Sequence, residues 1–168
     1  MAKQDTQEKN SLDVDTSEQQ IVVFRLGPER FGIDIELVRE ILRHQEVTRV
    51  PNAAAGLMGV IDIRGKVTPV IALDSKLQLP ASERTQDSRI MVVDVDGRDI
   101  GMVVDEVSEV VRFEANLVDP IPKSMHASGA AFVRGIARLE EGLTILLDIE
   151  QIAVGLDTDA LDRLDTAA

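Results

Sequence analysis

The chain has 168 residues, and its 30 Asp and Glu against 18 Lys and Arg give a formal net charge of −12. This acidity excludes a general nucleic-acid-binding protein, which needs a cationic face. The absence of cysteine excludes disulfides, thiolate metal sites and cysteine nucleophiles. Apolar residues make up 44% of the chain, which is enough for a hydrophobic core, yet no apolar run is long enough to span a bilayer. We therefore expect a soluble, cytoplasmic protein.

The N-terminal part of the chain predicts a tail followed by a hairpin. Residues 1–20 contain few apolar side chains and no secretory signal pattern, so we expect a disordered tail. Residues 21–26 and 30–35 flank a Gly-Pro-Glu sequence and predict a β-hairpin. Residues 36–42 carry apolar side chains at a spacing that fits either a helix or a strand.

The middle of the chain predicts two further hairpins. Residues 57–73 form two apolar runs around an Arg-Gly-Lys turn, where glycine supplies a positive φ. Residues 78–88 are polar and contain proline, which is typical of a linker. Residues 89–95 and 98–104 flank an Asp-Gly pair that suits a type I′ turn, so this is the clearest hairpin in the sequence.

The C-terminal part predicts one more hairpin between irregular segments. Residues 106–113 are apolar again, whereas residues 114–131 contain two prolines and predict a long loop. Residues 132–139 and 143–149 form the last predicted hairpin. Residues 155–168 are an acidic tail whose apolar side chains fit one face of a frayed helix.

An internal repeat organises these elements. Residues 21–42 shifted by 69 positions align with 90–111, and residues 59–74 shifted by 76 align with 135–150. The identities are Val23 with Val92, Gly32 with Gly101, Val38 with Val107, Glu40 with Glu109, Gly59 with Gly135 and Thr68 with Thr144. The repeat predicts an all-β protein of two similar units, each with two hairpins and one extra strand. Because small sheets leave exposed edges, we expect each unit to close into a barrel and the two to share an apolar seam.

The sequence offers no catalytic, cofactor or metal motif. His44 and His126 are the only histidines, and neither has a nucleophile or metal-ligand partner at a known spacing, so we expect both in solvated loops. The aspartates around Gly97 lack the spacing of a calcium loop, and the Gly65-Lys66 pair lacks the rest of a phosphate loop. We therefore predict a binding protein that is not an enzyme.

Two features are candidates for binding a partner. Arg64 lies at the end of an apolar run, where its guanidinium can hold a partner's carboxylate or carbonyls, or pair internally with Asp62 or a loop carbonyl. Residues 38–42 include apolar side chains that can face outward and bind an apolar helix face, or lie wholly in the core. The sequence pattern leaves these alternatives open.

Four stretches together carry a family resemblance: FRLGPERFGIDIELVREIL, VTRVPNAAAGLMGVIDIRGKVTPVIAL, VDGRDIGMVVDEVSEVV and VRGIARLEEGLTILLDIEQI. In this order and spacing, residues 21–154 resemble the CheW-like adaptor family of bacterial chemotaxis. The resemblance implies two intertwined five-stranded SH3-like β-barrels related by a pseudo-two-fold axis, with short connecting helices. It also implies a non-enzymatic adaptor without a cofactor or metal.

The resemblance further implies which partners this chain binds. Family members link the cytoplasmic tip of methyl-accepting chemotaxis receptors to the regulatory domain of the histidine kinase CheA, without inserting into the membrane. The receptor's helical hairpin docks between the barrels, and the matching motif positions here are Val38, Glu40, Gly59 and Arg64. The kinase-binding residues stay unassigned. The alternative is a CheW-like adaptor of another kinase pathway, such as pilus-type motility, that binds the kinase directly.

The sequence departs from the family pattern at two places. Asp62 stands where the family usually has asparagine, and Ala72-Leu73-Asp74 stands where Asp-Leu-Arg is common. The second departure puts in question any contact that the family makes at that end of the first barrel.

Overall fold

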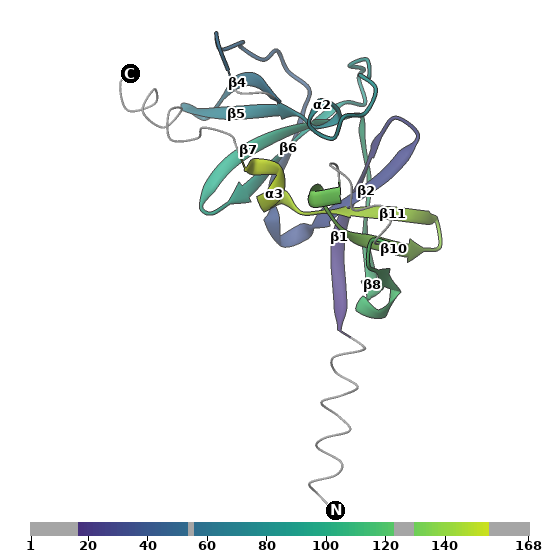
Figure 1. Cartoon of the computed structure of the whole chain (residues 1–168). Coiled ribbons are helices and arrows are strands. Elements are labelled where there is room, and N and C mark those ends of the chain that lie inside the picture. The colour runs from purple at the N-terminus through teal and green to yellow at the C-terminus, as the bar shows by residue number, and fades with distance from the viewer. Residues whose placement is uncertain (1–16, 54–55, 123–129, 155–168) are drawn as a thin grey trace, which may run out of the picture.

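The computed structural model describes residues 17–53, 56–122 and 130–154. Its strands form two sheets, with β4 and β5 in the upper part of Figure 1 and β8, β10 and β11 in the lower part. The strands are β1 (Glu18–Leu26), β2 (Glu29–Asp34), β3 (Val38–Arg43), β4 (Leu57–Ile63), β5 (Lys66–Ala72), β6 (Arg89–Val95), β7 (Arg98–Val104), β8 (Glu106–Glu114), β9 (Val118–Asp119), β10 (Val133–Leu139) and β11 (Gly142–Leu147). Short helices connect them: η1 (Ile35–Leu37), α2 (Leu73–Lys76), η2 (Ala115–Leu117), η4 (Ala130–Phe132) and α3 (Ile149–Ala153). The all-β prediction is confirmed.

The four predicted hairpins are all present, and two share one turn geometry. Arg64 and Gly65 have φ values of 51° and 84°, and Asp96 and Gly97 have φ values of 51° and 82°. Positive φ at both central residues is the signature of a type I′ turn, whose twist matches that of the flanking strands. Arg64 therefore occupies the first central position of the turn between β4 and β5.

The ambiguous segment 36–42 divides between a turn of 3-10 helix and a strand. Asp34 caps η1, because its side chain accepts a hydrogen bond from the Glu36 N–H at 3.0 Å. From Val38 onward the side chains alternate between half-buried and exposed, which is the period of a strand. Pairing with β6 is what selects the strand, since the local spacing alone fits both structures.

Two predicted boundaries need correction. Residues 18–20 were expected in the N-terminal tail, yet they belong to β1 and pair with residues 112–114 of β8. Residues 114–131 were expected to form one long loop, yet they include η2 and the two-residue strand β9, which pairs with β10. Residues 18–20 are polar, and β9 has only two residues, so the pairing of each segment with a neighbouring strand is what makes it regular. The remaining tail residues, 1–16 and 155–168, lie outside the described residues.

The two sequence repeats exchange strands. The sheet orders are β8-β1-β2-β11-β10-β9 and β3-β6-β7-β5-β4. Each sheet therefore contains the first hairpin of one repeat, with the third strand and the second hairpin of the other. Parallel pairing of β2 with β11, and of β5 with β7, joins the exchanged parts. The repeats are intertwined, as the family resemblance implied.

The repeat holds down to the residue register. Val23 lies opposite Gly32 in the first sheet, and Val92 lies opposite Gly101 in the second. Glu40 pairs with Val92, just as Glu109 pairs with Val23, and a bulge interrupts both strand pairs at the corresponding place. The two sheets are thus related by a pseudo-two-fold in backbone pairing as well as in sequence.

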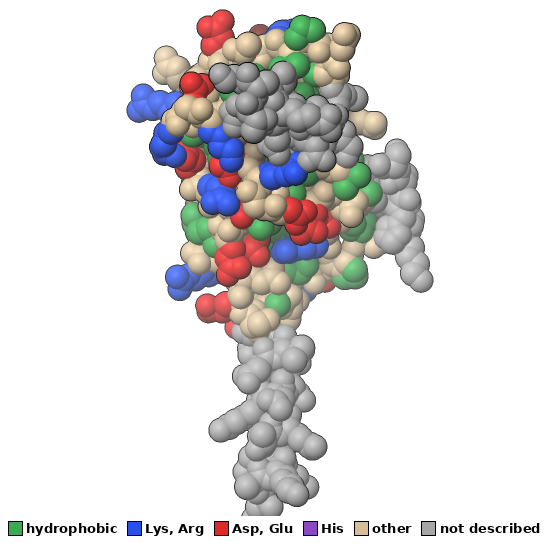
Figure 2. Space-filling view, turned by 90° about the vertical axis from the view of Figure 1, so that its left-hand side faces the viewer, with side chains coloured by type: hydrophobic (Ala, Val, Ile, Leu, Met, Phe, Trp, Pro, Cys, Tyr) green, Lys and Arg blue, Asp and Glu red, His purple; other side chains and the backbone are tan. Residues whose placement is uncertain are grey.

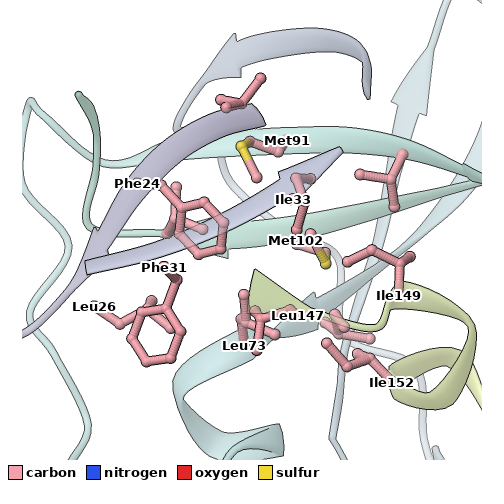
Figure 3. Close-up of a cluster of buried hydrophobic side chains, with 14 of the residues drawn as sticks. Phe24, Leu26, Phe31, Ile33, Leu73, Met91, Met102, Leu147, Ile149 and Ile152 are labelled. Atoms are coloured by element: carbon pink, nitrogen blue, oxygen red, sulfur yellow. The ribbon is translucent and has the colours of Figure 1, made fainter. Parts of the chain in front are cut away.

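One large apolar cluster lies between the sheets, which confirms the predicted seam. Figure 3 shows Phe24 and Phe31 from one sheet with Met91 and Met102 from the other. The two phenylalanine rings stack with their centroids 6.0 Å apart. Leu73 and two residues of α3 close the cluster. Burying each such large apolar side chain contributes about 1.5–3 kcal/mol, so the seam holds the two sheets together.

Each sheet also has its own small apolar cluster. One contains Ile21, Leu146 and Ala137, and the other contains Ile90, Val70 and Ile61, which are the corresponding residues of the repeat. These clusters lie on the opposite side of each sheet from the seam, as strand alternation requires. A sheet with a core on its concave side is consistent with the expected barrels.

Candidate functional site

Glu40 and Arg64 form the centre of the candidate site. Arg64 donates from Nη1 to Glu40 Oε2 at 2.8 Å and from Nη2 to Glu40 Oε1 at 3.2 Å, which makes a bidentate ion pair. Glu40 lies on β3 and Arg64 follows β4, and these strands stand at opposite ends of the five-stranded sheet. The sheet must therefore curl until its two edges meet at this pair.

A backbone connection reinforces this meeting of edges. Thr48, in the segment after β3, exchanges hydrogen bonds of 2.9 and 2.8 Å with Val60 on β4. In the other sheet, Asp119 of β9 pairs with Ile136 of β10, at the corresponding position of the repeat. The same edge closure thus occurs twice, which supports the prediction of SH3-like barrels.

The ion pair leaves donors available for a partner. The side chain of Arg64 is 77% exposed, while that of Glu40 is 24% exposed. Two of the five guanidinium N–H donors bind Glu40, and the others face solvent. The hydrogen bonds that Arg64 donates to Glu40, and then the charge of Glu40, raise the pKa of Arg64 above its usual value. Arg64 is therefore a cation, held by Glu40, that can donate hydrogen bonds to a carboxylate or carbonyl of another protein.

Val38 and Gly59 lie on β3 and β4, the strands that position the Glu40–Arg64 pair, and they affect how these two strands pack. Val38 is half-buried, lies opposite Val93 on β6 and packs against the seam. Gly59 is buried, and a Cβ there would overlap the carbonyl oxygen of Thr48. The structure thus brings Glu40 and Arg64 into contact, whereas Val38 and Gly59 set the positions of β3 and β4.

Of the alternatives that the sequence left open for Arg64, the internal pair with Asp62 does not form, because Arg64 pairs with Glu40. Asp62 instead accepts a hydrogen bond from the Gly65 N–H at 2.7 Å, which stabilises the turn that carries Arg64. An asparagine has an oxygen in the same place and can accept the same bond. The departure from the family pattern at position 62 therefore preserves the turn.

The second departure has a structural role. Asp74 is buried and accepts hydrogen bonds from the N–H groups of Ser75 at 2.7 Å and Ser82 at 3.1 Å. Arg84 lies 3.9 Å from the same carboxylate. Asp74 thus ties the 78–88 linker to the end of β5.

Exposed apolar residues recur at equivalent positions of the two outer strands. Ile41 on β3 is 41% exposed, and Val110 on β8, which is 69 positions later, is 51% exposed. Beside Ile41, Arg39 pairs with Asp99 at 2.6 Å and with Asp94 at 3.1 Å. Residues 38–42 are therefore neither wholly core nor wholly exposed. The sequence analysis did not propose Val110 as an exposed binding residue, although the repeat aligns it with Ile41.

The described residues hold no grouping of three or more His, Asp and Glu side chains that could bind a metal ion. In the same part of the chain, no helix is long and apolar enough to cross a membrane. His44 follows β3, and His126 lies outside the described residues. Figure 2 shows basic and acidic side chains interspersed over the visible face. The arrangement suits protein recognition through several modest contacts.

Comparison with known proteins identifies the family. The family model described as the CheW-like domain matches residues 20–156. The chain belongs to the CheW-like domain family. The chemotaxis protein CheW of Klebsiella aerogenes is 31% identical over 159 residues, which cover 95% of this chain and 94% of that protein. CheW of Bacillus subtilis is 29% identical over 142 residues, covering 84% and 90% of the two chains.

A solved CheW structure has the same fold. The scaffolding protein TtCheW from Thermoanaerobacter tengcongensis superimposes with a TM-score of 0.75 and 32% sequence identity, covering 81% of this chain and 92% of that one. A more distant relative is the protein PilI of Pseudomonas aeruginosa, 25% identical over 118 residues, which cover 70% of this chain and 66% of PilI. The CheW-like domain described above is thus a member of a family of chemotaxis scaffold proteins.

Proposed function

We propose that this chain couples methyl-accepting chemotaxis receptors to the histidine kinase CheA, as a cytoplasmic adaptor without enzymatic activity. The receptor's helical tip binds at the surface around Glu40 and Arg64, which Val38 and Gly59 keep in shape. The kinase's regulatory domain binds elsewhere on the same chain. Membership in a chemotaxis scaffold family supports this proposal.

The bidentate pair of Glu40 and Arg64 is the observation that carries the proposal. Glu40 is half-buried on β3, Arg64 is exposed in the turn after β4, and their pairing holds a cation with unused donors. A rigid arginine of this kind recognises carboxylate or carbonyl groups with little loss of side-chain entropy on binding. The ends of helices in a hairpin tip present such carbonyls.

The proposed contacts are individually weak. A small sheet that meets a helical tip buries a modest area, at or below about 1,200 Å², which is typical of transient signalling contacts. In a receptor array, many such contacts act together through their high effective concentration. Weak links of this kind let a receptor's conformational bias reach the kinase without locking the assembly.

A charge-exchange cycle on the full chain tests the receptor site. Arg64→Glu places two acidic side chains against each other, so we expect a loss of receptor-tip binding of at least about tenfold, with thermal unfolding still cooperative. The double variant Glu40→Arg with Arg64→Glu restores the pair with its charges reversed. If the double variant recovers binding, Arg64 acts by holding the site in shape through its ion pair. If binding stays lost, Arg64 contacts the receptor tip directly.

Arg138→Glu is the matched control for this cycle. Arg138 forms an exposed ion pair with Asp119 at 2.9 Å on the other sheet, so its reversal changes the net charge equally. We expect this variant to bind the receptor tip as the unmodified chain does. If the Arg64→Glu variant binds the receptor tip as well as the unmodified chain does, the receptor does not bind at this surface.

The relative PilI favours a second candidate function, namely an adaptor of a pilus-type kinase pathway that binds its kinase directly. Separate capture experiments with a purified receptor tip and a purified kinase distinguish the two functions. The chemotaxis proposal requires binding to both, and the second candidate requires binding to the kinase alone.

A further inference from the structure

A basic pocket lies at the end of β3, away from the Glu40–Arg64 pair. Arg43, His44, Arg89 and the turn of residues 85–87 line a cavity of about 570 Å³. Arg43 and Arg89 are directly opposite each other on the antiparallel strands β3 and β6. Like charges at such positions destabilise a sheet, because their Cβ atoms stand only about 4.5–5.5 Å apart.

The repeat supplies a counterpart in which the facing pair of arginines is absent. At the corresponding place in the other sheet, Gln20 lies opposite Arg112, and both line a separate cavity. The position of His44 is occupied there by the buried Phe113. The counterpart cavity also has a second arginine, Arg134, but three acidic residues line it as well, namely Glu18, Asp34 and Glu36. The pocket at Arg43 has two arginines, an imidazole and a single acidic residue, so it is the more basic of the two.

The arginines of the pocket form no ion pair within the described residues, although backbone carbonyls hold Arg89 in place. Arg89 donates from Nη1 to the carbonyl oxygens of Gln86 at 2.7 Å and Ser88 at 2.9 Å, which leaves its other nitrogens available. Within the described part of the chain, Arg43 has no ion-pair partner. The buried Nδ1 atom of His44 also lacks a hydrogen-bond partner there.

We propose that this pocket binds an oxyanion of the phosphate type. Two guanidinium groups that face one cavity match the several oxygens of such an ion, and the arginine fork binds them in pairs. The anion also removes the repulsion between Arg43 and Arg89. Asp87 is the acidic group of the cavity wall and opposes binding, so the pocket suits a weak, exchangeable ligand.

The test measures thermal stability and NMR shifts of the full chain with inorganic phosphate against chloride at equal ionic strength. Binding to the folded state raises the melting temperature with saturation, and shifts the amide signals of residues 85–89 and the ring signals of His44. Arg43→Gln removes a guanidinium that has no structural partner, so we expect affinity to fall about tenfold or more. Asp87→Asn removes the opposing charge and should tighten binding.

Arg112→Gln is the matched control, since it makes the same substitution at the counterpart. It should leave phosphate binding unchanged. Equal weakening by Arg43→Gln and Arg112→Gln, or no saturable effect of phosphate on the unmodified chain, would overturn the proposal. A parallel titration with phosphoserine identifies the source of the group, because tighter binding than that of phosphate indicates a phosphorylated side chain and equal binding indicates the free ion.

Discussion

Gly59 and Gly135 occupy equivalent positions on β4 and β10, where a neighbouring segment crosses each strand closely. A Cβ at Gly135 would lie 2.8 Å from a side-chain carbon of Val118 and 3.0 Å from the carbonyl oxygen of Asp119. At Gly59 the obstacle is the backbone of Thr48, which cannot move without breaking the bridge to Val60. These glycines permit the edge closure on which the candidate site rests.

Gly59→Ala should therefore destabilise the fold and open the site. Forcing a methyl group against the backbone costs about 1–3 kcal/mol, measured as a lower urea midpoint. The amide protons of Thr48 and Val60 should also lose protection from hydrogen exchange. Gly65→Ala is the control, because the added Cβ meets nothing within 4 Å and strains only the positive-φ turn. If the amides of Thr48 and Val60 stay protected in Gly59→Ala, the close approach is not what requires glycine.

His44 gives the fold a pH dependence of predictable sign. Burial, and then the charge of Arg84, lower the pKa of His44 below its usual value of 6.5. The unfolded chain therefore takes up the proton first as pH falls, so the stability due to neutral His44 is present above pH 6.5 and lost below it. In His44→Gln, the free energy of unfolding should fall less steeply with decreasing pH, measured by urea titrations in buffers without phosphate. An unchanged slope in the variant would show that other groups cause it.

At the scale of elements, the hairpins are encoded locally and the irregular segments are not. Alternating apolar residues and Asp-Gly or Arg-Gly turns specify β4 to β7 within a few residues, so the sequence locates them well. The two-residue strand β9 has no local signal, because only its pairing with β10 makes it a strand. For the same reason, η1 and β3 could not be told from a helix over so short a run.

The two type I′ turns share a side-chain cap that can be tested. Asp62 accepts from the Gly65 N–H at 2.7 Å, and Asp94 accepts from the Gly97 N–H at 2.8 Å. Asp62→Ala should cost about 1 kcal/mol in urea unfolding, because the turn loses its acceptor. Asp62→Asn keeps an oxygen in place and should unfold like the unmodified chain. Equal losses in both variants would mean that the carboxylate's charge, and not its hydrogen bond, stabilises the turn.

At the scale of the whole molecule, the exchange of strands between repeats is the feature that the local pattern could not specify. Hydrophobic alternation indicates which residues form strands, but it does not indicate which strands pair when they are far apart in the sequence. For this reason the contact between Glu40 and Arg64 could not be predicted, since the two residues meet only when the sheet curls. The sequence repeat, in contrast, correctly indicated both the second sheet and the shared seam.

Strand exchange makes a prediction about unfolding. Neither sheet can form without strands from both repeats, and one apolar seam joins them. We expect one cooperative transition, with equal calorimetric and van't Hoff enthalpies. Two separate transitions in calorimetry would show that the sheets fold independently.

The most direct test of the adaptor function is a bridging measurement. Size-exclusion chromatography of a receptor-tip fragment with the regulatory domain of CheA should show separate peaks, and addition of the full chain should bring all three into one complex. The Arg64→Glu variant should retain the kinase domain and release the receptor tip. Competition between the two partners for one surface of the chain, or a complex that forms equally well without the chain, would contradict the account.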